Sequence, residues 1–276
     1  MSARSQDVNT IKDAGWRQGS ALPSELVDSL TTERQFPWDV SSSDILIVLS
    51  HDCDITNASL LAEPNVEILR LRSVQERNGN LDWGKNPRRY QFIDSRTVPP
   101  SIFEVSVHDR AVVPRDRLIG HFPDTAKSID DSTRSRLCLW VAARYTRAAF
   151  PDAFNDRIMP AVDELRPQFK SKGHFITGIY LHVIDDELPQ EEDYALQLIA
   201  TMIHEHYVDP TMRASAQDLV NRIEAAIASC SGLSLAVTEL RSEAELSIAE
   251  LRKLKRWDFD DLSLRRSGTQ DLPPSV

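Results

Sequence analysis

The spacing of apolar residues changes near residue 122, and this change constrains the fold of this chain more than any other feature. Before it, short runs rich in Ile, Val and Leu are separated by turn residues, a pattern typical of short strands. After it, apolar residues recur at helical spacing, first at Leu137, Trp140, Val141 and Tyr145. The sequence therefore predicts an α+β protein whose N-terminal part is mostly β.

The expected strands of the N-terminal part are short. They comprise ILIVLS at 45–50, VEILRLRSV from Val66, and the segments RYQFIDS, SIFEVSVHD and RAVVP. Asn78-Gly79 is a hairpin signal between the second and third of these. Several short strands without intervening helices favour a small closed sheet, so we predict an SH3-like β-barrel over residues 1–122.

A helical and α+β domain is predicted over residues 123–265, followed by a disordered tail at 266–276. The expected strands are HFITGIYLHVIDDEL and LSLAVTEL. The expected helices are DDSTRSRLCLWVAARYTRAAF, FPDAFNDRIMPAVDELRPQF, EEDYALQLIATMIHEHYVD, ASAQDLVNRIEAAIASC and SEAELSIAELRKLKRW. The third of these helices is expected because its acidic first turn suits the helix macrodipole.

The net charge of −10 is unevenly distributed along the sequence. Residues 70–150 hold 15 basic and 9 acidic residues, whereas residues 181–276 sum to −9. A protein that binds nucleic acid without sequence preference relies on basic residues to neutralise phosphates. We therefore expect nucleic-acid contact through residues 70–150 and a protein partner for the acidic C-terminal half.

The composition also indicates a compartment. No apolar run approaches the roughly 20 residues needed to span a bilayer, and the first 15 residues contain no apolar signal segment. The three cysteines are odd in number and far apart, which favours free thiols over disulfides. These features predict a cytoplasmic protein without membrane contact.

The segment ILIVLSHDCDIT places His51, Asp52, Cys53 and Asp54 directly after a buried strand. A thiol beside an imidazole is the minimal arrangement for a nucleophile, with a carboxylate to orient the ring. Cys53, His51 and Asp54 are therefore candidate catalytic residues, with His108, His121 and His182 as alternative bases. In the alternative interpretation Cys53 is a small buried residue and the aspartates cap a turn. A ligand contact site is a third possibility.

No metal site and no cofactor are expected. No second Cys or His pair stands at ligand spacing near Cys53. His204 and His206 are two residues apart on an expected helix, so their imidazoles point in different directions.

Four arginines are candidate nucleic-acid contacts. Arg88 and Arg89 precede an aromatic residue beside the predicted hairpin, and Arg144 and Arg147 are three residues apart on a predicted helix. The alternative is that these side chains form intramolecular ion pairs or lie in solvent.

The sequence resembles a group of uncharacterised bacterial proteins that combine a W-x-Q-G opening with a strand followed by S/T-x-x-C-D. The matching positions here are Trp16, Gln18, Gly19, Ser50, Cys53 and Asp54. The first 120 residues are also distantly similar to the PemK/MazF toxin barrel, whose members cleave RNA. Residues 20–43 are inserted relative to that family, and an acidic cluster follows the strand.

Three functions are compatible with these features. The first is a cytoplasmic prokaryotic component of an antiviral defence or toxin–antitoxin system that binds nucleic acid or a partner. The second is a hydrolase or nuclease with Cys53 as nucleophile. The third is a non-catalytic adaptor subunit. The residues do not decide whether the protein is an enzyme.

Overall fold

The computed structural model describes residues 10–146 and 148–258, and these form two compact units. Unit 1 contains the described residues of Met1–Arg77 and Gln91–Ala142, and unit 2 those of Asn78–Tyr90 and Ala143–Val276. The predicted division lay at residue 122. In the structure the chain leaves unit 1 for the segment 78–90, which belongs to unit 2, and then returns to unit 1. It leaves unit 1 for the last time after Ala142, inside helix α4 (Asp131–Thr146). The predicted tail, 266–276, lies outside the described residues.

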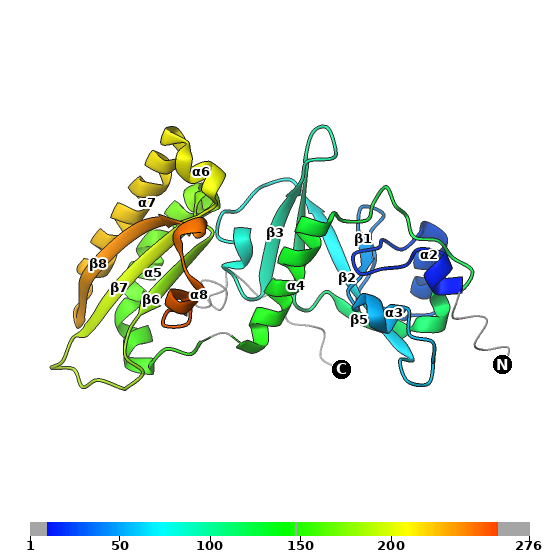
Figure 1. Cartoon of the computed structure of the whole chain (residues 1–276), viewed down its shortest axis with the longest axis horizontal. Helices are drawn as coiled ribbons and strands as arrows, with labels where there is room; N and C mark the ends of the chain where they lie inside the picture. Colours follow the sequence, from blue (N-terminus) through cyan, green and yellow to red (C-terminus); the bar gives the residue numbers. More distant parts are fainter. Residues whose placement is uncertain (1–9, 147, 259–276) are drawn as a thin grey trace. The chain divides into compact units, whose positions relative to one another are not determined.

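Unit 1 is built on a five-stranded sheet in which β2 is central (Figure 1). Its strands are β1 (Ile45–Val48), β2 (Asn65–Val74), β3 (Arg89–Asp94), β4 (Ser101–Ser106) and β5 (Arg110–Pro114). β2 is antiparallel to β1 on one side. On its other side the first half of β2 pairs with β5 and the second half with β4, both antiparallel. The sheet order is β1-β2-β4-β3, and no pairing that closes a barrel occurs among the described strands. The SH3-like assignment is therefore not confirmed, whereas the α+β class agrees with the structure.

The core of unit 1 lies between this sheet and the N-terminal segment. Helix α2 (Ser24–Thr32) buries Leu26 and Leu30 against strand residues such as Val48 and Ile68. Two short helical turns complete the unit: α3 (Asp52–Ile55) and the 3-10 turn η2 (Arg115–Leu118). Both are stabilised by tertiary contacts, because single turns are not stable alone.

Unit 2 is a four-stranded sheet with two long helices packed on it. α5 (Asp152–Lys172) and α7 (Pro210–Ala228) lie on one face of the sheet (Figure 1). The strands, in the order β8-β7-β6-β9, are β8 (Leu233–Ser242), β7 (Tyr194–Met202), β6 (Gly178–His182) and β9 (Lys255–Arg256). β7 and β8 are parallel and joined through α7, while the other pairs are antiparallel.

Two predicted helices of unit 2 are wrong. Residues 194–202 form strand β7, because Tyr194, Leu196 and Leu198 alternate inward with period two. Only the end of that segment is helical, as α6 (His204–Val208). The predicted helix at 242–257 is instead the turn η4 (Glu243–Glu245), the four-residue α8 (Ile248–Leu251) and β9.

The segment 78–90 packs against the C-terminal end of helix α5 and the turn that follows it. The Lys85 ammonium is buried and donates to the carbonyl oxygens of Gly173 at 2.8 Å and Ile176 at 2.7 Å. Trp83 Nε1 donates to the His174 carbonyl at 2.8 Å. These carbonyl groups belong to the turn that follows α5, so the donors hold the chain directly after the helix. The 3-10 turns η1 (Asp82–Gly84) and η3 (Gly173–Phe175) bring the two segments together.

We predict that Gly79→Ala destabilises unit 2 by about 1–3 kcal/mol or more, because the added methyl group overlaps rigid backbone. A Cβ at Gly79 would lie 2.3 Å from the Phe169 carbonyl oxygen and 2.8 Å from the Gly173 nitrogen. Urea unfolding monitored by tryptophan fluorescence measures the loss. Glu224→Ala is the control, since it truncates an exposed side chain of helix α7 in the same unit. Equal stability losses in the two variants would show that the contact with α5 is not tight.

Candidate functional site

The segment Ser50–Ile55 follows the end of β1 and is held by hydrogen bonds. His51 caps the single turn α3, and its Nδ1 accepts the Cys53 backbone N–H at 3.2 Å. The Ser50 hydroxyl accepts the Glu67 N–H of β2 at 2.8 Å. Ile55 is buried in the core, whereas His51, Asp52 and Cys53 are exposed. This segment thus exposes three polar side chains, while hydrogen bonds from Ser50 and His51 hold its backbone.

The W-x-Q-G segment lies against the segment Ser50–Ile55. Gln18 donates its backbone N–H to Asp52 Oδ1 at 2.6 Å and its side-chain Nε2 to the Leu49 carbonyl at 2.7 Å. Trp16 is buried and donates Nε1 to the His121 carbonyl at 2.9 Å. Gly19 has φ +86°, a conformation that favours glycine, and its N–H reaches the Val48 carbonyl. The two sequence motifs therefore form one structural element, which we call the corner (Trp16–Gly19 with Ser50–Ile55).

Arg115 supports the corner from inside. Its side chain is fully buried and donates to four carbonyl oxygens at 2.7–2.9 Å, those of Asp54, Ile55, Asn57 and Ser59. Burial lowers the pKa of the Arg115 guanidinium, and the nearby Glu63 and Asp54 carboxylates oppose that effect. Arg115 could not be identified from the sequence, because its partners are main-chain atoms about 60 residues away.

The contacts of the predicted catalytic residues do not assemble a dyad or triad. The Nδ1 of His51 is engaged with the main chain, and within the described structure no contact joins the Asp54 carboxylate to this ring. Nor do the described residues contain a group of three His, Cys, Asp or Glu side chains that would hold a metal ion. Of the alternative bases, His121 lies 3.6 Å from Glu25, and His182 belongs to unit 2.

The described members of the predicted nucleic-acid set lie near the start of β3 and at the end of α4, at positions assigned to unit 2. Arg89 is exposed at the start of β3 and has interactions of its own, and Arg88 before it is half-buried. Arg144 is exposed in the last turn of α4, and Arg147 lies outside the described residues.

Most other basic side chains of residues 70–150 are used inside the fold. Lys85 and Arg115 are buried on carbonyl oxygens, and six more basic residues form ion pairs with carboxylates. These six pairs are Arg70–Asp109, Arg72–Glu104, Arg96–Asp94, Arg117–Glu33, Lys127–Asp124 and Arg134–Asp131. Just over half of the basic residues of this segment are therefore bound to carboxylates or carbonyl oxygens, whereas Arg77, Arg89, Arg136 and Arg144 are exposed.

Regrouping the charges by unit removes the asymmetry seen along the sequence. Unit 1 contains 14 Lys and Arg against 19 Asp and Glu, and unit 2 contains 18 against 23. Each unit therefore has a net charge of −5, and neither has the overall basic charge on which non-specific binding to nucleic acid depends.

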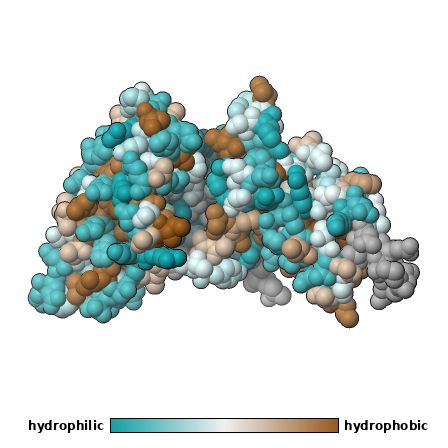
Figure 2. All heavy atoms as spheres, in the orientation of Figure 1, coloured by the Kyte–Doolittle hydropathy of each residue, from teal (hydrophilic) through white to brown (hydrophobic). Residues whose placement is uncertain are grey.

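Unit 2 has an acidic loop, residues 185–193, between β6 and β7. Asp185 pairs with Lys255, and Glu187 accepts the backbone N–H groups of Asp152 and Ala153 at the start of α5. Four other carboxylates are exposed and have no ion pair in the described part of the chain: Asp186, Glu191, Glu192 and Asp193. The region of this loop is mainly hydrophilic in Figure 2.

Arg157 on α5 fixes the acidic loop. Its guanidinium donates to the carbonyl oxygens of Leu188, Pro189 and Glu192 at 2.7–3.0 Å, and to that of Gly232 at 3.1 Å. It also lies 4.9 Å from the centre of the Tyr194 ring, a cation–π contact. The loop is thus attached through its backbone, which leaves its four free carboxylates directed to solvent.

The comparisons found no matching protein-family model, no matching curated protein and no matching solved structure. Among the described helices none is long and apolar enough to cross a membrane. A functional assignment therefore depends on the contacts of the residues themselves.

We predict that Arg115→Met destabilises unit 1 by about 3 kcal/mol, since it leaves one buried and three partly buried carbonyl oxygens without this donor. Urea unfolding gives the loss, and limited proteolysis locates it at residues 54–59. Arg34→Met, at an exposed position of the same unit, is the control. Similar stability of the two variants would mean that the carbonyl cluster does not support the corner.

Cysteine labelling tests the contacts of Cys53. We expect a maleimide at neutral pH to modify Cys53 about tenfold faster than the other thiols, because Cys53 is exposed and burial raises the pKa of Cys138 and Cys230. We further expect His51→Gln to change the Cys53 rate by no more than about twofold, since the imidazole caps the backbone. A large fall in rate in this variant would instead identify His51 as the base of a Cys–His pair.

Proposed function

We propose that this protein is a binding component that docks a basic protein partner through the acidic loop of unit 2. The observation that carries the proposal is the set of four exposed carboxylates without ion pairs on a loop whose backbone Arg157 fixes. The first hypothesis from the sequence was a component that binds nucleic acid or a protein partner, and this proposal chooses the protein partner. It is also compatible with the third hypothesis, a non-catalytic adaptor subunit.

Two physical effects support this proposal. Clustered charge of one sign accelerates association with an oppositely charged surface and selects against partners of the same sign. A loop already held in one conformation loses little entropy on binding, so more of the interaction energy appears as affinity. Arg157 supplies that rigidity without neutralising the carboxylates, because it contacts only carbonyl oxygens of the loop.

The alternative functions have less support. A nucleophilic thiol needs an adjacent base or cation, and the imidazole next to Cys53 is engaged with the main chain. Nucleic-acid binding needs available basic side chains, and most of those in residues 70–150 are paired or buried. A role in a prokaryotic defence or toxin–antitoxin system, in the cytoplasm, remains a proposal that rests on the sequence resemblance.

Co-purification of the tagged full-length chain from its native host tests the proposal. We expect a basic protein to co-purify in stoichiometric amount with the wild type. The variant Asp186→Asn, Glu191→Gln, Glu192→Gln, Asp193→Asn should weaken the affinity of the purified partner about tenfold or more, because it removes the complementary charge.

The matched control variant also removes four exposed carboxylates of unit 2: Asp156→Asn, Glu164→Gln, Glu205→Gln and Glu224→Gln. It should retain the partner. The proposal fails if the wild type purifies without a protein partner, or if both variants bind it equally. Loss of binding only on Arg88→Gln, Arg89→Gln and Arg144→Gln, with nucleic acid in the purified sample, would favour the nucleic-acid alternative.

A further inference from the structure

Unit 1 contains a cavity of about 500 Å³ next to the corner. Its walls come from the N-terminal segment, the end of α3, the turn between β3 and β4, and the loop 123–130. Side chains that line it include Lys12, Trp16, Arg17, Arg96, Pro123 and Ile129. Cavities of a few hundred Å³ with a few polar groups among apolar ones are typical of small-molecule sites.

Two basic side chains of this cavity are available to a ligand. Lys12 and Arg17 are exposed, and neither side chain has an ion pair or hydrogen bond within the described structure. They differ in this respect from the paired arginines and lysines elsewhere in unit 1. Arg17 is bonded to its own turn through backbone groups: its N–H donates to Ser20 Oγ at 3.0 Å, and its carbonyl accepts the Ser20 N–H at 3.0 Å.

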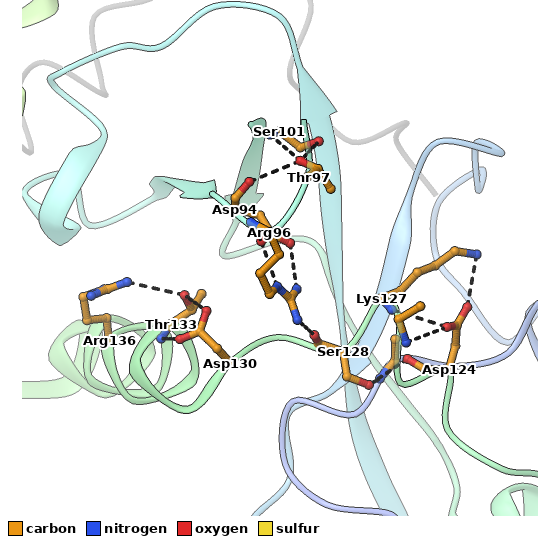
Figure 3. A network of polar contacts seen from close by, with 12 residues as sticks. Asp94, Arg96, Thr97, Ser101, Asp124, Lys127, Ser128, Asp130, Thr133 and Arg136 are labelled. Atoms are coloured by element: carbon orange, nitrogen blue, oxygen red, sulfur yellow. Dashed lines mark hydrogen bonds and ion pairs between the residues drawn. The ribbon is translucent and has the colours of Figure 1, made fainter. Parts of the chain in front are cut away.

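The opposite wall is held in place by Arg96. Its guanidinium forms two hydrogen bonds with the Asp94 carboxylate, at 2.7 and 2.8 Å, and a third with the Ser128 carbonyl (Figure 3). The Ser128 hydroxyl in turn accepts the Ala21 N–H at 2.9 Å. These contacts tie the loop 123–130 to the turn after β3 and to the segment after Gly19. The cavity is therefore preformed.

The one carboxylate that lines the cavity is occupied. Asp130 accepts the backbone N–H of Thr133 at 2.9 Å and its hydroxyl at 2.8 Å, and so begins helix α4 (Figure 3). Arg96 is paired with Asp94, and Asp130 keeps its negative charge, so the cations available to a ligand are Lys12 and Arg17. The surface for a non-polar part of a ligand is supplied mainly by the half-buried Pro123, because Trp16 and Ile129 are only 2% and 8% exposed.

We propose that this cavity binds a small phosphate-bearing ligand, with Lys12 and Arg17 contacting the phosphate and the apolar wall contacting the rest of the molecule. A guanidinium donates paired hydrogen bonds to phosphate oxygens, and an ammonium adds a mobile positive charge. This site lies in unit 1 and does not depend on the acidic loop of unit 2.

Isothermal titration calorimetry of the full-length chain with pyrophosphate and with ADP tests the proposal. We expect saturable binding of at least one of them, weakened about tenfold or more in the double variant Lys12→Gln, Arg17→Gln. Thr125→Trp should also abolish binding, because it fills the cavity and leaves both cations in place. Arg34→Gln removes an exposed positive charge elsewhere in unit 1 and should bind as the wild type does.

The two ligands distinguish the source of the phosphate. Equal affinities would assign recognition to the diphosphate alone, and tighter binding of ADP would show that the apolar wall contacts the nucleoside. Circular dichroism confirms that each variant is folded. Absence of saturable binding of both ligands to the wild type would overturn the proposal, as would unchanged binding in either cavity variant or an equal loss in Arg34→Gln.

Discussion

Both units depend on a guanidinium group that binds several carbonyl oxygens at once. Arg115 does this in unit 1 and Arg157 in unit 2, each with four carbonyl partners. In an irregular loop some carbonyl groups point inward and receive no hydrogen bond from a helix or strand. A buried acceptor without a donor lowers the stability of the fold. Arginine has five N–H donors in one plane, so one side chain can satisfy a whole turn.

The two clusters have different consequences for function. In unit 1 the cluster supports a corner whose Trp16 and Arg17 line a cavity together with Lys12. In unit 2 it holds a loop whose free carboxylates face solvent. Binding residues often lie on loops positioned by a rigid scaffold. Here arginine side chains provide the rigidity in both places.

Much of the fold could be predicted from local sequence patterns. The apolar run at β1 and the alternation in β2 predicted strands correctly, and helical spacing located α5 and α7. The failure at β7 has a physical reason. The acidic residues before Tyr194 imitate the first turn of a helix, whereas they belong to a loop that Arg157 holds.

The candidate site could be predicted only in part. The motifs around Trp16 and Cys53 indicated a special segment, and the structure brings them together through Gln18. The chemistry could not be inferred, because the role of His51 depends on a hydrogen bond to the backbone. The basic character of the middle segment could not be carried over to a surface, because its charges are divided between two units and several of them pair with carboxylates, most of which lie in the same segment.

The most direct test of this account is the affinity of the purified partner for an Arg157→Gln variant, with every carboxylate of the acidic loop intact. The substitution makes unit 2 more negative by one charge but removes the donors that fix the loop. If rigidity of the loop matters, the basic partner should bind about tenfold more weakly. Equal or tighter binding would contradict the account, because charge alone would then explain recognition.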